Sequence, residues 1–188
     1  GIAVDIAPPP RAETPQGQRL PALAEAMRAA GIVRCSFGGE PALTLAPPIV
    51  RFGAVAVTPP AGGFLQASAE GEAMLSRLVL DAASGSKRAV DLFCGSGAFT
   101  FPLAEGMSVK GFDADRGAVA AFNEAARHAG GRPVSAEVRN LFERPLTAED
   151  LRDYDVAVFD PPRAGSSAQA EQLAKSRLKR VIAVSCNP

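Results

Sequence analysis

Residues 89–100 read AVDLFCGSGAFT, an apolar run that ends at a Gly-x-Gly turn and continues into residues compatible with a helix. A buried strand that stops at such a turn and feeds a helix lets the backbone come close to a ligand, and the start of the helix supplies unpaired N–H groups. The third glycine of a dinucleotide fingerprint is missing, because Thr100 stands in its place. The stretch therefore predicts a nucleotide-like ligand in an α/β protein, and it favours a smaller adenosine compound over a nicotinamide dinucleotide.

The composition indicates a globular protein, because 47% of the 188 residues are apolar. The 20 basic and 20 acidic side chains give a formal net charge of zero, so overall charge gives no support to nucleic-acid binding and leaves room for a local basic patch. No apolar run is long enough to span a membrane, and we expect no membrane partner. Because the first residue is Gly1 rather than Met, we expect a fragment of a longer protein.

The first 67 residues differ in composition from the remainder, since ten of the 16 prolines lie within the first 60 residues. We predict that residues 1–67 form a small α+β appendage, or the end of an upstream central domain, and that residues 68–188 form the main domain. In the appendage we expect a strand, an alanine-rich helix that Gly31 ends, and three short strand-like pieces. These elements cover residues 1–7, 20–30, 32–37, 42–45 and 49–57.

Beyond residue 67 the chain alternates between helix-like and strand-like segments. Ser68 can cap the first helix, and Thr147 forms a capping box with Asp150 for a short helix around Leu151. The alternation and the continuous β-branched strands predict a Rossmann-like fold with a parallel, doubly wound sheet. Ligands of such sheets bind beyond the carboxyl ends of the strands. The further strands and helices are predicted at residues 107–113, 116–129, 134–138, 155–160, 168–176 and 180–185.

Two polar residues follow predicted strands next to the glycine turn. Asp113 closes a strand 18 positions after Gly95, where a carboxylate can accept hydrogen bonds from both hydroxyls of an adenosine ribose. The alternative is an aspartate that caps the following helix. Asn140 follows the next strand, and its amide can face an adenine edge or form a turn.

The segment Asp160-Pro161-Pro162-Arg163 comes directly after a predicted buried strand. Two prolines fix the backbone and donate no N–H, so a flat substrate can lie against them. Asp160 can accept a hydrogen bond from a substrate N–H, and Arg163 can hold a phosphate. The alternative, a plain turn at the end of a strand, leaves the aspartate and the arginine on either side unexplained.

The three cysteines, Cys35, Cys94 and Cys186, lie far apart and form no C-x-x-C pair. This spacing argues against a disulfide framework and a zinc site, so we expect no metal and a location in the reducing cytoplasm. Packing in the core is the default role of a lone cysteine, and we assign it to Cys35 and Cys94. Cys186 instead follows the last predicted strand on the ligand side, where a thiolate of lowered pKa is a candidate nucleophile.

Three segments of this chain, in this order, resemble the RNA (uracil-5) methyltransferase family. They are VDLFCGSGAFT at residues 90–100, FDPPRAG at residues 159–165 and VSCNP at residues 184–188. A fourth, FLQAS at residues 64–68, is similar to the family's segment with a glutamine close to the cofactor. The resemblance implies a class I methyltransferase domain that uses S-adenosylmethionine to methylate carbon 5 of a uridine in ribosomal or transfer RNA.

The resemblance also implies roles for individual residues. Asp160 lies where cofactor and target base meet and orients the base, and Cys186 is the nucleophile. Arg163 is a substrate contact on the grounds given above, as a holder of phosphate. One departure is Ala98, where relatives often have Asn, and this puts one cofactor hydrogen bond in question. The cofactor-binding residues that follow from the family and from the glycine turn are Gln66, Phe93, Gly95, Gly97, Asp113, Asn140 and Asp160.

The implied mechanism begins with addition of the Cys186 thiolate to carbon 6 of uracil, which makes carbon 5 nucleophilic. After methyl transfer a base removes the proton from carbon 5 and the thiolate leaves. The family's base is a glutamate near its carboxyl terminus, and neither this glutamate nor the family's last two strands have a counterpart here. We therefore expect a domain truncated at its C-terminus that binds cofactor and does not turn over by itself.

Two alternatives stay open on the sequence. The first is an amino-group methyltransferase of the (N/D)PP type, although an aromatic residue usually stands where this chain has Arg163. The second is a catalytically incomplete module that only binds the cofactor.

Overall fold

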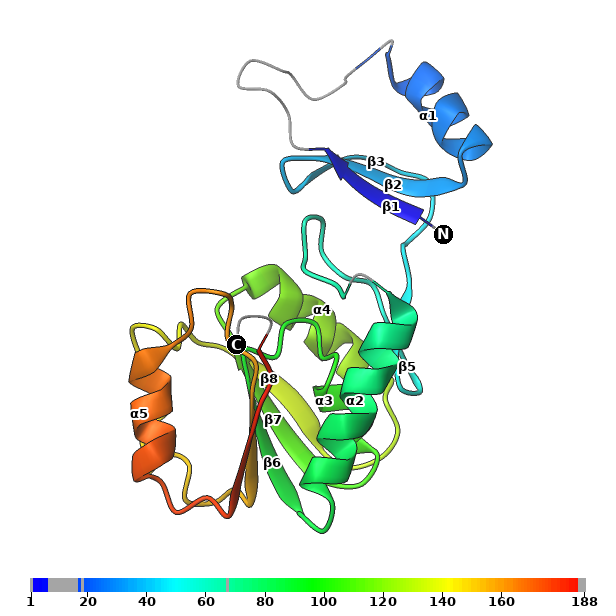
Figure 1. Ribbon diagram of the computed structural model, residues 1–188. Coiled ribbons are helices and arrows are strands. Elements are labelled where there is room, and N and C mark those ends of the chain that lie inside the picture. The colour runs from blue at the N-terminus through cyan, green and yellow to red at the C-terminus, as the bar shows by residue number, and fades with distance from the viewer. Residues whose placement is uncertain (1, 7–16, 18, 67, 186–188) are drawn as a thin grey trace.

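The computed structural model describes residues 2–6, 17, 19–66 and 68–185 of the chain. Within these residues the strands form three sheets, of five, three and two strands. The five-stranded sheet carries the helices of the predicted main domain, and the three-stranded sheet lies with one helix at the other end of the molecule (Figure 1).

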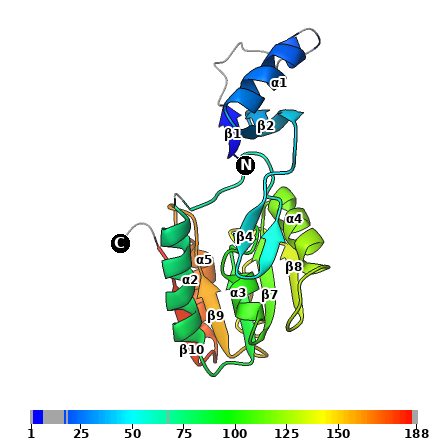
Figure 2. The ribbon, with the colours of Figure 1, turned by 90° about the vertical axis from the view of Figure 1, so that its right-hand side faces the viewer.

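The five-stranded sheet is entirely parallel, with the order β10-β9-β6-β7-β8. The chain starts in the middle and moves first to one side and then to the other, so the sheet is doubly wound and the predicted fold class is confirmed. Helices α2, α3 and α4 cover one face and α5 covers the other (Figures 1 and 2). The elements are α2 (Ala69–Ala83), β6 (Arg88–Leu92), α3 (Thr100–Ala104), β7 (Ser108–Asp113), α4 (Arg116–Ala126), β8 (Val134–Val138), β9 (Val156–Phe159), α5 (Ser167–Lys175) and β10 (Arg180–Ala183).

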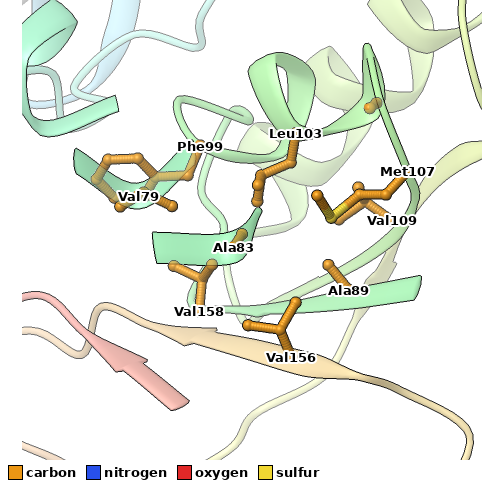
Figure 3. Close-up of a cluster of buried hydrophobic side chains, with 10 residues drawn as sticks. Val79, Ala83, Ala89, Phe99, Leu103, Met107, Val109, Val156 and Val158 are labelled. Carbon is orange, nitrogen blue, oxygen red and sulfur yellow. The ribbon is translucent and has the colours of Figure 1, made fainter. Parts of the chain in front are cut away.

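Helices cover both faces of the central strands. Successive side chains of a strand point to opposite faces of the sheet, so each strand has buried side chains on both sides. Ala89 of β6 and Val156 and Val158 of β9 pack under Val79 of α2 and Leu103 of α3 (Figure 3). The opposite face buries Val90, Leu92 and Ala157 with Leu173 of α5. Continuous apolar strands are therefore required here, as the sequence pattern predicted.

The predicted cap of α2 is confirmed, since the Ser68 hydroxyl accepts a hydrogen bond from the Gly71 N–H at 3.1 Å. The predicted helix around Leu151 is wrong, because residues 148–153 form turns only. The capping box itself is present: the Thr147 N–H donates to Asp150 and the Asp150 N–H donates to the Thr147 hydroxyl. The turns do not extend into a helix because Asp155, which accepts from the N–H groups of Lys87 and Arg88, fixes the chain just before β9.

The small sheet has the order β1-β2-β3, with β1 parallel and β3 antiparallel to β2. Helix α1 covers one of its faces (Figure 1). Strands β2 and β3 are joined at Gly38 and Gly39, whose φ angles of 58° and 85° suit glycine. The elements are β1 (Ile2–Ile6), α1 (Arg19–Ala29), β2 (Ile32–Phe37) and β3 (Glu40–Thr44).

Residues 49–57, predicted as one strand-like piece, form a hairpin of β4 (Val50–Phe52) and β5 (Val55–Val57). The chain turns at Gly53, which has a φ of 58°. Phe52 and Val57 are buried in a cluster with Phe101 of α3 and Phe122 of α4. This hairpin therefore packs on the five-stranded sheet's helices, although it precedes residue 67; the division at that residue stays a prediction.

Candidate active site

The carboxyl ends of β6, β7, β8 and β9 lie at one edge of the sheet, because these strands are parallel neighbours. Each is followed by a residue that the sequence analysis singled out: the glycine turn after β6, Asp113 at the end of β7, Asn140 after β8 and Asp160 after β9. The structure therefore brings these predicted site residues to a common edge. Their roles towards a ligand stay predictions.

The glycine turn folds back on the neighbouring strand. The N–H groups of Phe93 and Cys94 both donate to the Phe112 carbonyl, at 2.8 and 3.1 Å. Phe93 has a φ of 67°, and it is the one residue other than glycine with a positive φ in the described part of the chain. Such strain is typical of functional sites.

The two glycines of the turn have different surroundings. A Cβ added at Gly95 would have no neighbour within 4 Å, so the backbone there is open to a ligand. A Cβ at Gly97 would lie 2.6 Å from the Phe101 ring, so this glycine is required by packing. Gly95 is the position at which a ligand can approach the main chain.

Asp113 ties the turn to β7. Its Oδ2 accepts from the Gly95 N–H at 2.8 Å and its Oδ1 accepts from the Asp115 N–H at 2.8 Å. The cap of α4 is Asp115, whose carboxylate accepts from Gly117 and Ala118, so the alternative in which Asp113 caps this helix is wrong. Each carboxylate oxygen has a second lone pair, and Asp113 can therefore still accept from a diol.

Asn140 forms a turn, because its Oδ1 accepts from the Phe142 N–H at 3.0 Å. This bond supports the turn alternative for Asn140, and its predicted role towards adenine is untested. The turn places the Phe142 ring, which is 45% exposed, 5.4 Å from the Phe93 ring. Sequence reasoning missed Phe142, although an aromatic residue two positions after a turn-forming Asn at a ligand edge was a usable signal.

Asp160 is half-buried, and burial raises the pKa of its carboxyl group to about 6. The prolines that follow lead into a turn in which the Gly165 N–H donates to the Pro162 carbonyl at 2.7 Å. Arg163 is exposed, so its guanidinium is accessible from solvent. An aspartate whose pKa lies near neutrality can hold a ring N–H or give up a proton close to physiological pH.

Asp91, inside β6, also belongs to this edge; the sequence places it there but gives it no role. It is fully buried and accepts a hydrogen bond from the Thr100 hydroxyl, and its Oδ1 has no partner among the described residues. Burial first, and then the charges of Asp160 and Asp113, raise its pKa to about 7. The charges of Asp160 and Asp113 thus reach Asp91, and an edge with several carboxyl groups favours a positively charged ligand.

The raised pKa of Asp91 predicts a dependence of stability on pH. Between about pH 4 and 7 the folded state keeps a proton that the unfolded state has lost, so stability falls as pH rises through this window. We expect the free energy of unfolding to fall between pH 5 and pH 8 in the wild type, and to fall by about 2–4 kcal/mol less in Asp91→Asn. Urea unfolding at the two pH values measures both changes. Equal losses in both proteins would show that Asp91 ionises normally.

The remaining predicted residues lie as follows. Gln66 is half-buried and precedes the amino end of α2 in the chain, and its role towards a cofactor is untested. Cys186 lies outside the described residues, so its role as nucleophile is untested. Cys94 is buried, and burial raises the pKa of its thiol well above the ordinary value, as suits a packed cysteine. Cys35 is also buried, and burial raises the pKa of its thiol.

Two other observations concern parts of the described chain away from this edge. A cavity of about 480 Å³ lies between β5, α3 and the end of α4, and none of the predicted site residues lines it. None of the helices in the described part of the chain combines the length and apolar character that a membrane crossing demands.

The parallel sheet, its order and its ligand edge define the class I methyltransferase fold. A crystal structure of Pyrococcus abyssi tRNA (uracil-54, C5)-methyltransferase in complex with S-adenosyl-L-homocysteine superimposes with a TM-score of 0.71. The match covers 84% of this chain and 41% of that one at 24% sequence identity, and thus supports the fold alone.

Sequence relatives give the family. A protein of Agrobacterium fabrum named as an uncharacterised RNA methyltransferase is 47% identical over 84% of this chain and 38% of its own length. A 23S rRNA (uracil-C5)-methyltransferase, RlmD, of Nitrosococcus oceani is 34% identical over 66% of this chain and 29% of its own. No family model matches. The chain is thus homologous to RNA methyltransferases, which confirms the resemblance, and it spans less than two fifths of the first relative's length.

Proposed function

We propose that this chain is the cofactor-binding part of an S-adenosylmethionine-dependent RNA (uracil-5) methyltransferase. The observation that carries the proposal is the glycine turn, open at Gly95 and held by Asp113, beside a second carboxylate at Asp160. One relative supports the substrate class, because it is named for uracil in ribosomal RNA; the solved structure that shares the fold is named for uracil in transfer RNA. Cytoplasmic RNA of either kind is the proposed partner.

The residues of the edge fit S-adenosylmethionine. Asp113 has free acceptor sites for the ribose hydroxyls, and the open backbone at Gly95 allows close approach. The carboxyl groups of Asp91, Asp113 and Asp160 favour a sulfonium over a neutral ligand. When bound, the cofactor supplies an electrophilic methyl group. Gln66, Phe93 and Asn140 are further proposed contacts.

The protein's own part of the reaction falls to Asp160 and Cys186. Asp160 accepts from the N–H of the uracil ring and fixes the base against Pro161 and Pro162. The Cys186 thiolate adds to carbon 6, and the electron pair of the 5,6 double bond moves to form an enolate, so that carbon 5 becomes nucleophilic. After methylation a base takes the carbon 5 proton, the double bond re-forms and the thiolate leaves. The target base is unpaired or splayed out of its helix.

The test uses labelled S-adenosylmethionine and total RNA with the longer protein. We expect label in 5-methyluridine at a defined position of ribosomal or transfer RNA. Label on an exocyclic amino group would instead identify an amino-group methyltransferase of the (N/D)PP type. Binding of the cofactor with no transfer to RNA would overturn the proposed reaction and leave a binding module.

A further inference from the structure

The loop after β8 presents an aromatic ring to solvent. Phe142 is 45% exposed and belongs to none of the buried apolar clusters of the described residues, whereas Leu141, directly before it, is 1% exposed. A single exposed apolar side chain is ordinary on a protein surface. The case for a role of Phe142 therefore depends on how the ring is held and on what lies beside it.

The loop that carries Phe142 is closed by its own hydrogen bonds. The Asn140 Oδ1 accepts from the Phe142 N–H at 3.0 Å, and the Asn140 carbonyl accepts from the Arg144 N–H at 2.8 Å. The Arg139 Nε donates to the Arg144 carbonyl at 2.8 Å, and its Nη2 donates to the Pro145 carbonyl at 2.9 Å. The ring is thus held in place before any ligand arrives, which lowers the entropic cost of binding against it.

The ring lies next to the proposed ribose contact. The Arg139 N–H donates to the Asp113 carbonyl at 2.8 Å, so the loop begins directly beside Asp113. The Phe142 ring contacts that of Phe93 after β6, with centroids 5.4 Å apart, and Phe93 lies 6.0 Å from Phe159 at the end of β9. Three phenyl rings therefore form a row across the carboxyl ends of β8, β7, β6 and β9, and Phe142 is the most exposed of them.

The order of the strands decides which end of the cofactor meets this ring. In S-adenosylmethionine the adenine and the sulfonium are attached to opposite ends of the ribose. With the ribose at Asp113, the sulfonium has to point towards Asp160, where the target base is held. Asp160 follows β9 on one side of Asp113, and Phe142 follows β8 on the other side. Adenine therefore extends from Asp113 towards β8, which is one strand spacing of about 4.8 Å away.

We propose that Phe142 stacks on the adenine ring of the cofactor, an inference that rests on the proposed function. A phenyl face contributes to the binding of a flat base by stacking, without any hydrogen bond. Phe93 contacts Phe142 at a tilt of 59° between the ring planes, and nearly half of Phe142 stays exposed, so a second ring has room to stack on it. Asn140 and Arg139 are positioning residues for this stack, because they hold the loop.

Titration calorimetry with S-adenosylhomocysteine on the 188-residue chain tests the stack. Phe142→Leu keeps an apolar side chain against Phe93 and removes the ring. We expect its affinity to fall by about tenfold, since stacking of a base on an aromatic side chain contributes about that factor or more. Phe142→Tyr keeps the ring face and should bind within about twofold of the wild type. Thermal unfolding of each variant checks that the fold is kept.

A fluorescence measurement separates stacking from a purely structural role of the side chain. The chain contains no tryptophan, so Phe142→Trp introduces a single indole at the proposed stack. A base stacked on an indole quenches its fluorescence, and we expect S-adenosylhomocysteine to quench Phe142→Trp in a saturable way. Leu78→Trp, at an exposed position of α2, is the matched control and should keep its fluorescence.

Equal affinity of Phe142→Leu and the wild type, or binding to Phe142→Trp without quenching, would overturn the stack and leave the proposed function in place. An equal loss of affinity in Phe142→Leu and Phe142→Tyr would also overturn it, because a structural role would then suffice. A stack on RNA predicts weaker binding of a single-stranded oligouridylate to Phe142→Leu with unchanged binding of S-adenosylhomocysteine, and this outcome counts against the proposal too. If the wild type fails to bind S-adenosylhomocysteine, the proposed function is wrong, and the adenine stack with it.

Discussion

Replacing Cys186 with Ala should abolish covalent capture of RNA that contains 5-fluorouridine, in the protein that carries the complete active site. The wild type should form an adduct, because the thiolate adds to carbon 6 and fluorine at carbon 5 cannot leave as a proton does. The reaction then stops with protein and RNA joined. Denaturing electrophoresis measures the fraction captured, and mass spectrometry identifies the peptide.

Cys94→Ala is the matched control, since it removes a thiol that is buried and whose pKa is raised by burial. We expect this variant to form the adduct if it folds, and thermal unfolding of the same sample checks that it does. An adduct on a peptide that contains Cys94, or capture that persists in Cys186→Ala, would refute the assignment of the nucleophile.

Replacing Asp113 with Ala should weaken binding of S-adenosylhomocysteine by about 100-fold. The variant loses the acceptor for the ribose hydroxyls, and the Gly95 N–H loses its partner, so the glycine turn is no longer fixed. Hydrogen bonds to a charged group contribute about 1.5–3 kcal/mol, and 100-fold corresponds to about 2.7 kcal/mol. Titration calorimetry measures the change.

Asp153→Ala is the control for charge, because Asp153 is exposed in the turns before β9 and is none of the predicted site residues. It should bind S-adenosylhomocysteine like the wild type. Equal affinity of Asp113→Ala and wild type would remove Asp113 from the cofactor site, whatever its role in holding the turn.

The parts of the structure that could be predicted are those in which local pattern and long-range packing agree. The strand before the glycine turn has to be apolar on both faces, and this requirement is visible in residues 89–93. Ser68 caps a helix whose apolar spacing is also helical. Parallel strands then bring Asp113 and Asp160 to one edge by topology alone.

The parts that could not be predicted depend on contacts distant in the sequence. The turns at residues 148–153 do not extend into a helix, because Asp155 accepts a hydrogen bond from the Arg88 N–H at the start of β6, 67 residues away. The place of Asp91 next to the glycine turn is visible in the sequence, but its full burial is not, and neither are the charges of Asp160 and Asp113 that help to raise its pKa. Gly53 divides β4 from β5, and this turn was indistinguishable from an irregularity in one strand.

The hairpin of β4 and β5 has a consequence for how such proteins can be recombined. Phe52 and Val57 come from the proline-rich part of the chain, yet they complete an apolar cluster with Phe101 and Phe122. A chimera of two homologues that is joined at residue 67 would take Phe52 and Val57 from one parent and Phe101 and Phe122 from the other. The side chains of this cluster would then not have been selected to pack together. The two parts therefore cannot be exchanged independently at residue 67, whereas a joint before residue 50 would keep all four side chains of this cluster from one parent.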